Sequence, residues 1–300
     1  MHPTELKSVL ASGMLSFPVT DFKGDGSFDS QSYSRRVEWL AKQGASALFV
    51  AGGTGEFFSI TNSEYDAVIR AGVEGAGNKP AIAGIGYGTL TAIDLARRAQ
   101  AAGAAGLLVL PHYLIHAEQS GIVEHLIAIC QSVDIGVIYY ARDNSSLGPE
   151  ALWKIANACP NFIGYKDGLG DLQLIVQIMD SLRDRLVYIG GLPTAEIFAQ
   201  SYFDIGVTTY SSAVYNFVPE LAVRFYNAVR EHNRAVVQQL LHDFYLPLIA
   251  LRDRRKGYAV AMIKAGVELV GRSAGKVRSP LISLDEVERG ILLDLIKKNS

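Results

Sequence analysis

The chain has 300 residues, of which 49% are hydrophobic and 19% are charged, and its formal net charge is −2. This near-neutral balance gives no excess of positive charge with which to bind nucleic acid or an anionic membrane surface, so neither is expected as a partner. No apolar stretch reaches the ~18 residues of a membrane span, and the N-terminus has no basic region followed by an apolar core, so we expect no signal peptide.

Short apolar runs alternate along the chain with longer segments of helical periodicity. The runs predict eight strands: Met14–Thr20, Ala47–Ala51, Ala81–Ile85, Gly106–Leu110, Gly136–Tyr140, Phe162–Lys166, Leu186–Gly190 and Gly206–Thr209. The segments between them predict eight helices: Tyr33–Gln43, Ser63–Gly75, Thr91–Ala102, Ser120–Ser132, Pro149–Ala158, Asp171–Leu182, Thr194–Tyr202 and Pro219–His232. Because the strands are apolar almost throughout, we expect helices on both faces of the sheet.

Strict alternation of strands and helices predicts an α/β protein with a parallel sheet. Eight such units favour a closed (β/α)8 TIM barrel over residues 1–232. The alternative is an open, doubly wound sheet, but the glycines of 84–88 lack the spacing of a dinucleotide-binding turn. Residues 233–300 add three helices and no strand: Ala235–Leu251, Tyr258–Val270 and Asp285–Lys298. No proline- or serine-rich linker precedes them, so we expect one structural domain, a barrel with a C-terminal helical extension packed on it.

The two cysteines, Cys130 and Cys159, are far apart in the chain and lie in apolar helical contexts. They form neither a zinc-binding spacing nor a disulfide framework. Buried free thiols are therefore expected, and they suit the reducing conditions of the cytoplasm.

Lys166 closes the sixth predicted strand and precedes a turn rich in glycine and aspartate. A lysine at the end of a buried strand has few solvated rotamers, and burial lowers the pKa of its amine. A neutral amine can attack a carbonyl and form a Schiff base. The alternative is a structural lysine that extends to the surface or pairs with Asp167. Barrel active sites lie at the carboxyl ends of the strands, where Lys166 falls, which favours the catalytic role.

The second predicted strand ends in a glycine-rich turn, Gly52–Glu56. Glycines let backbone N–H groups converge on an anion, and Thr54 adds a hydroxyl donor. The turn is therefore a candidate anion-binding site. The alternative is a tight connection between strand and helix that needs glycines for steric reasons alone.

Tyr139 stands near the end of the fifth predicted strand. Because side chains alternate along a strand, Val137 and Tyr139 share one face, as Gly164 and Lys166 do on the next strand. Adjacent strands would then direct the Tyr139 hydroxyl and the Lys166 amine into the same mouth, where a phenol can relay protons to a forming imine. The alternative is a core tyrosine whose hydroxyl is satisfied internally.

Other residues near the strand ends are candidates for the mouth of the barrel and for substrate binding: Tyr113, Arg142, Gly190, Gly191, Thr208, Ser211 and Ser212. Arg142 suits a carboxylate, although a surface ion pair would explain it as well. His112 and His116 have no third ligand beside them, so no metal site is expected.

Three blocks in this order, Gly52–Glu56, Tyr139 and Gly164–Asp167, resemble the dihydrodipicolinate synthase / N-acetylneuraminate lyase family. The resemblance covers nearly the whole chain. It implies a (β/α)8 barrel, a Schiff base between a lysine and a small-molecule 2-oxo acid, no metal or organic cofactor, and usually a homotetramer.

By position, the resemblance makes Lys166 the Schiff-base lysine and Tyr139 the proton-relay tyrosine. Gly53 and Thr54 fall where the family grips the carboxylate next to the ketone, and Tyr113 matches a second relay tyrosine. Many relatives have a threonine in place of Gly53, and its loss weighs against synthase chemistry. The arginine with which synthases hold a second substrate is replaced by Asn144, with Arg142 close by, so the contact to a distal carboxylate stays open.

Within the family, four stretches resemble decarboxylating dehydratases of six-carbon keto diacids: Leu15–Thr20, Ala51–Phe58, Gly164–Asp171 and Gly206–Ala213. The resemblance thus implies loss of water and CO2 from a 2-oxo diacid through a lysine Schiff base. An aldolase or lyase that cleaves a carbon–carbon bond to pyruvate shares the enamine and is the first alternative. A barrel that binds a ligand without catalysis is the second, and the presence of both Lys166 and Tyr139 argues against it.

Overall fold

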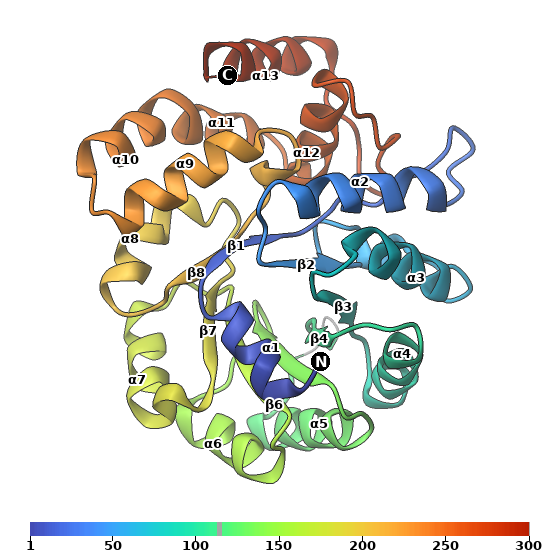
Figure 1. Ribbon diagram of the computed structural model, residues 1–300, viewed down its shortest axis with the longest axis vertical. Coiled ribbons are helices and arrows are strands. Elements are labelled where there is room, and N and C mark those ends of the chain that lie inside the picture. Colours follow the sequence, from blue (N-terminus) through green and yellow to red (C-terminus); the bar gives the residue numbers. More distant parts are fainter. Residues whose placement is uncertain (113–115, 300) are drawn as a thin grey trace.

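Eight parallel strands close on themselves in sequence order, with β8 hydrogen-bonded to β1, in a computed structural model that describes residues 1–112 and 116–299 (Figure 1). The strands are β1 (Gly13–Ser16), β2 (Ala47–Val50), β3 (Ala81–Ile85), β4 (Gly106–Val109), β5 (Gly136–Ala141), β6 (Phe162–Asp167), β7 (Val187–Gly190) and β8 (Thr209–Ser212). The predicted (β/α)8 barrel is confirmed, and the pairing of β8 with β1 excludes the open sheet.

A ring of helices surrounds the barrel (Figure 1). Its members are α2 (Ser30–Lys42), α3 (Tyr65–Ala76), α4 (Thr89–Ala101), α5 (Gln119–Gln131), α6 (Pro149–Ala158), α7 (Leu172–Leu182), α8 (Glu196–Asp204) and α9 (Pro219–Arg230). Two of them, α2 and α7, begin with a side-chain cap: the carboxylate of Asp171, for example, accepts a hydrogen bond of 3.0 Å from the backbone of Leu174. Among residues 1–112 and 116–299 we find no helix with the length and apolar character that crossing a bilayer requires.

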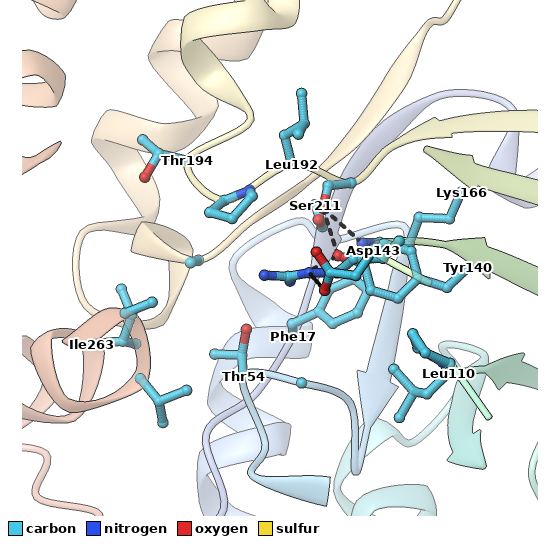
Figure 2. Close-up of a pocket in the computed structure, with 18 of the residues that line it drawn as sticks. Phe17, Thr54, Leu110, Tyr140, Asp143, Lys166, Leu192, Thr194, Ser211 and Ile263 are labelled. Carbon is cyan, nitrogen blue, oxygen red and sulfur yellow. Dashed lines mark hydrogen bonds and ion pairs between the residues drawn. The ribbon is translucent and has the colours of Figure 1, made fainter. Parts of the chain in front are cut away.

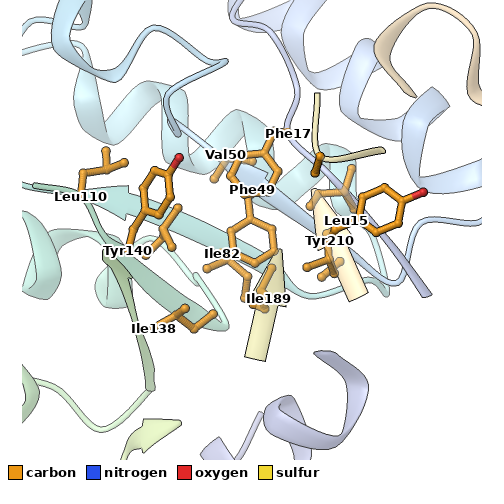
Figure 3. Close-up of a cluster of buried hydrophobic side chains, with 14 of the residues drawn as sticks. Leu15, Phe17, Phe49, Val50, Ile82, Leu110, Ile138, Tyr140, Ile189 and Tyr210 are labelled. Atoms are coloured by element: carbon orange, nitrogen blue, oxygen red, sulfur yellow. The ribbon is translucent and has the colours of Figure 1, made fainter. Parts of the chain in front are cut away.

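Buried apolar side chains of the strands form one continuous cluster (Figure 3). The rings of Phe17 and Phe49 stack with their centroids 4.5 Å apart, and Phe49 and Ile189 are fully buried. Burial of each such side chain stabilises the fold by about 1.5–3 kcal/mol. The barrel interior is therefore a packed core, and a ligand can enter only from one end.

The amino end of the barrel is closed by α1 (Pro3–Leu10), a helix that the sequence did not predict (Figure 1). Its Leu6 is fully buried against the starts of β4 and β5, where a Cβ added to Gly106 would lie 2.6 Å from the leucine. Glycine is required there because the helix approaches the strands so closely. The carboxyl end is left as the open mouth.

The C-terminal extension packs on one side of the barrel (Figure 1). It comprises α10 (Arg234–Leu240), a π-helical turn (Leu241–Tyr245), α11 (Leu246–Arg252), α12 (Tyr258–Leu269) and α13 (Glu286–Asn299). The π-helical turn interrupts the single helix predicted over Ala235–Leu251. Pro247 follows it at the start of α11, and because proline has no N–H, the regular ladder of hydrogen bonds cannot run through this point.

Strand β8 begins three residues later than predicted, at Thr209 instead of Gly206. Gly206 adopts a left-handed φ of +98°, and the backbone of Val207 donates back to Tyr202 of α8. Residues 206–208 thus belong to the turn that leaves the helix, which moves the serines at the end of β8 toward the mouth.

Candidate active site

A cavity of about 1080 Å³ opens at the carboxyl ends of the strands. Thr54, Tyr140, Lys166 and Ser211 gather at its barrel side, and Ile263 of α12 lies across from them (Figure 2). The C-terminal extension therefore forms one wall of the cavity. This position is the one where (β/α)8 barrels place their active sites.

Lys166 lies near the end of β6 and is only 3% exposed. Its Nζ donates to the carbonyl oxygen of Gly191 at 3.3 Å and lies 3.7 Å from the centre of the Tyr140 ring. Burial, and then the positive charge of Arg142, hold the pKa of the amine well below its usual value, against the opposing effect of Asp167. The site therefore favours the neutral, nucleophilic form of the amine.

Asp167 points to the opposite face of β6 and does not hold the lysine. Its carboxylate accepts hydrogen bonds from the backbone of Leu169 at 2.9 Å and from the hydroxyl of Tyr202. Side-chain alternation along the strand separates the two neighbours. Both structural alternatives for Lys166, a pair with Asp167 and a surface position, are thus excluded.

Tyr140 is the tyrosine that shares the cavity with Lys166, because the two residues are paired in the register of β5 and β6 (Figure 2). Its hydroxyl donates to the Gly191 carbonyl at 2.8 Å, the same oxygen that accepts from the lysine. Arg142 donates to the Tyr140 hydroxyl at 3.2 Å. Phenol and amine therefore meet at one shared acceptor.

The prediction that the Tyr139 hydroxyl enters the mouth is wrong. Tyr139 points away from the cavity, packs against the ring of Tyr165 and donates to the carbonyl of Ser145 at 2.5 Å. The register between β5 and β6 shifts by one residue between Val137 and Ile138. Beyond this shift Lys166 is paired with Tyr140 and not with Tyr139, so the alternation of side chains counted from the starts of the two strands gives the wrong tyrosine.

The turn after β2 brings Gly53 and Thr54 to the cavity, as predicted. Two non-glycine residues in left-handed conformation flank it, Ala51 with φ 51° and Glu56 with φ 56°. A Cβ at Gly52 would lie 3.0 Å from the Phe17 ring, whereas a Cβ at Gly53 would meet open space. A side chain at Gly52 would thus press on the Phe17 ring, whereas the backbone at Gly53 is accessible to a ligand.

The cavity is lined by two arginines, Arg142 and Arg252, whose side chains stay positively charged at any physiological pH. Arg142 lines it as predicted, and its Nε pairs with Asp143 at 3.3 Å. His112 and His116 also line it, but no group of three metal-ligating side chains occurs in residues 1–112 and 116–299. The positive charge of the arginines in the cavity wall suits an anionic ligand better than a cation.

The remaining candidates are divided between the two ends of the barrel. Ser211 and Gly191 line the cavity as predicted, but Gly190 and Ser212 do not. Thr208 precedes β8 and donates to the carbonyl of Ala11 after α1, so it lies at the amino end and its predicted binding role is wrong. Tyr113 falls outside the described residues.

Glu56, at the end of the glycine-rich turn after β2, forms a buried ion pair with the C-terminal extension. Its carboxylate lies 2.7 Å from the Nζ of Lys264 on α12, and the two side chains are 0% and 4% exposed. A second carboxylate oxygen accepts from the backbone of Arg278 at 3.0 Å. The extension therefore fixes the turn that carries Gly53 and Thr54.

Lys264→Ala should lower the free energy of unfolding by about 3–5 kcal/mol, because it leaves Glu56 charged and buried without its partner. Urea denaturation at neutral pH measures this loss. The double variant Lys264→Met/Glu56→Met, which removes both charges, should recover most of it. A Lys264→Ala variant within about 1 kcal/mol of the parent would contradict the importance of the pair.

Comparison with known proteins gives consistent results. The model of the dihydrodipicolinate synthetase family matches residues 10–299. A protein of Rhizobium rhizogenes named "Probable 5-dehydro-4-deoxyglucarate dehydratase" is 52% identical over 297 residues, covering 99% of this chain and 98% of that protein. One of Azotobacter vinelandii with the same name is 52% identical over 301 residues, covering 99% of each. Dihydrodipicolinate synthase from Bacillus clausii superposes with a TM-score of 0.87 at 28% identity, over 98% of this chain and 99% of that one.

The closed barrel and the buried lysine at its mouth, which has no carboxylate partner among the described residues, define a (β/α)8 protein equipped for carbonyl chemistry through an amine. The chain belongs to the dihydrodipicolinate synthetase family.

Proposed function

We propose that the protein converts 5-dehydro-4-deoxy-D-glucarate into 2,5-dioxopentanoate, water and CO2 through a Schiff base on Lys166. The observation that carries this proposal is a buried lysine amine that has no carboxylate partner among the described residues and lines the same cavity as the glycine-rich turn of Gly53 and Thr54. Relatives that bear the dehydratase name over their full length support the choice of substrate.

The proposed reaction begins with attack of the neutral Lys166 amine on the substrate ketone. Thr54 and the Gly53 N–H bind the carboxylate beside that ketone, and the Tyr140 hydroxyl shuttles protons until the carbinolamine loses water. Arg142 is the candidate for the distal carboxylate, because it reaches the cavity from the end of β5.

The iminium acidifies the adjacent methylene, and loss of one proton from it gives an enamine. The enamine expels the neighbouring hydroxyl, which leaves with a proton as water. The conjugated iminium then accepts the electron pair of the carbon–carbon bond to the distal carboxylate, which leaves as CO2. Protonation and hydrolysis release 2,5-dioxopentanoate and the free amine. Lysine is the electron sink throughout, so the chemistry requires no cofactor.

Incubation with 5-dehydro-4-deoxyglucarate separates this proposal from an aldolase of the same family, which shares the enamine. We expect one equivalent of CO2 and of 2,5-dioxopentanoate for each substrate consumed, measured by trapping of the gas and by NMR of the product. Release of pyruvate without CO2 would instead establish carbon–carbon cleavage and exclude the dehydratase.

The proposal includes a homo-oligomer, a tetramer or a dimer, in the cytoplasm. Large apolar side chains stand exposed on the single chain, among them Leu90 at 84% and Val287 at 72%. Symmetric assembly is a common way to cover such side chains. Sedimentation velocity measures the state directly, and a monomer at micromolar concentration would contradict this part.

A further inference from the structure

The wall of the cavity behind β8 contains a buried carboxyl group, that of Glu196, which the proposed chemistry does not use. Glu196 is the first residue of α8 and is 1% exposed. Its Oε1 accepts a hydrogen bond of 2.6 Å from the hydroxyl of Ser212. Within the described residues its Oε2 has no hydrogen-bond partner, and no ion pair joins it to a cation.

The contrast with the other fully buried glutamate at this end of the barrel is informative. Glu56 has Lys264 at 2.7 Å to balance its charge, whereas Glu196 has only a hydroxyl. A buried carboxylate without a counter-charge costs several kcal/mol, and a protonated carboxyl avoids this cost. Burial, partly offset by the Ser212 hydrogen bond, raises the pKa of Glu196 to about 7.

The groups that face Glu196 are uncharged. Tyr210 of β8 and Tyr245 of the π-helical turn are both buried, and their hydroxyls also lack hydrogen-bond partners within the described residues. Burial raises the pKa of both phenols, and an ionised Glu196 would raise it further, so neither phenol supplies a charge near neutral pH. Behind them, the ring of Tyr226 on α9 packs against Tyr210.

Helix α11 of the extension carries a cation, Arg252, which contacts the loop 191–195 and does not pair with the carboxyl of Glu196. Arg252 of α11 donates to the Thr194 hydroxyl at 2.7 Å and pairs with Asp253 at 2.7 Å. Its charge is thus directed to these two partners, and the carboxyl of Glu196 keeps a surrounding of hydroxyl groups and apolar side chains.

The position of Glu196 connects it to the reacting groups. Residues 191–195 join β7 to α8, and the first of them, Gly191, offers the carbonyl that accepts from both Lys166 and Tyr140. The hydrogen bond between Glu196 and Ser212 fastens the far end of this loop to the end of β8. Displacement of the loop would therefore move the acceptor that aligns the amine and the phenol.

We propose that Glu196 is a positioning residue that works as a neutral acid, fastening the loop 191–195 to β8 and keeping this wall of the cavity uncharged for a dianionic substrate. This inference rests on the proposed function, because it assumes a diacid in the cavity. An ionised Glu196 would repel that substrate through a medium of low dielectric constant, whereas the protonated form does not.

The test compares Glu196→Gln and Glu196→Ala with the parent, using 5-dehydro-4-deoxyglucarate from pH 6 to 9 at constant ionic strength. The KM of the parent should rise about fivefold or more across pH 7 as the carboxyl ionises, and the KM of Glu196→Gln should not. Glu196→Ala should lower kcat about tenfold or more through loss of the loop anchor, and glutamine should restore most of it. Glu38→Gln, on the exposed face of α2, is the matched control.

A second readout needs no substrate. Because the pKa of Glu196 is raised from 4.5 to about 7 by folding, its contribution to stability is fully present below pH 4.5 and is lost as the pH rises through about 7. The Tm of Glu196→Gln relative to the parent should therefore increase by about 2–5 °C between pH 4.5 and 8.

The outcomes separate the two proposals. Absence of turnover by the parent at every pH would remove the proposed function, while the Tm difference still tests the neutral carboxyl. If the Tm of the parent and the Tm of Glu196→Gln change in parallel with pH, the proposal that Glu196 is a neutral acid is overturned. If the KM rises with pH to the same extent in the parent and in Glu196→Gln, the proposed electrostatic role of Glu196 is overturned.

Discussion

Replacement of Lys166 by alanine should lower kcat by at least about 10³-fold, because the variant has no amine to form the Schiff base that carries every later step. The cavity should still bind the substrate, since Thr54 and Arg142 remain in its wall. Single-turnover measurements with 5-dehydro-4-deoxyglucarate, together with calorimetric binding, separate the loss of chemistry from a loss of affinity.

A matched control is Lys154→Ala, which removes a lysine 58% exposed on α6 and should leave kcat unchanged. A general effect of lost positive charge would appear in both variants. Turnover by Lys166→Ala within about tenfold of the parent would contradict the Schiff-base mechanism.

Removal of the Tyr140 hydroxyl should lower kcat about 10²–10³-fold, because a positioned phenol is the proposed proton relay. Tyr140→Phe keeps the ring that lies 3.7 Å from the Lys166 amine and loses only the hydroxyl on the Gly191 carbonyl. The KM should change little if the hydroxyl acts mainly in the transition state. Steady-state kinetics, with circular dichroism to confirm folding, measures both parameters.

The neighbouring tyrosine offers a control with the same substitution. Tyr139→Phe loses a buried hydrogen bond to the Ser145 carbonyl and should cost about 1 kcal/mol of stability with kcat within about twofold of the parent. An equal loss of kcat in both phenylalanine variants, or a larger loss in Tyr139→Phe, would contradict the placement of Tyr140 at the reacting centre.

The architecture was predictable because it depends on local periodicity. Eight apolar runs alternating with amphipathic segments are enough to specify a barrel of parallel strands. The boundaries at β8 and at the π-helical turn were not predictable to the residue. The first depends on how the backbone leaves α8 at Gly206, and the second on the π-helical turn that forms before Pro247.

The site was predictable where one segment carries the signal. Lys166 and the turn at Gly53 and Thr54 each lie at the end of a strand, and the strand positions alone bring them to the mouth. Whether Tyr139 or Tyr140 faces Lys166 depends on a register shift between β5 and β6. The hydrophobic periodicity of the sequence gives no information about this shift.

Glu196 was missed for a different reason. It is a single acidic residue at the start of a helix, where acids are common. Its burial depends on the π-helical turn that brings Tyr245 against α8, and its hydrogen-bond partner, Ser212, lies on another element. Only the assembled fold brings these groups together.

Reductive trapping would show whether Lys166 forms a covalent imine with the substrate, the step on which the proposed chemistry depends. The protein is incubated with 5-dehydro-4-deoxyglucarate and sodium borohydride, then digested and analysed by mass spectrometry. A stable adduct on the peptide that contains Lys166, absent without substrate, is the expected result. No adduct, or an adduct on a different lysine, would contradict the mechanism.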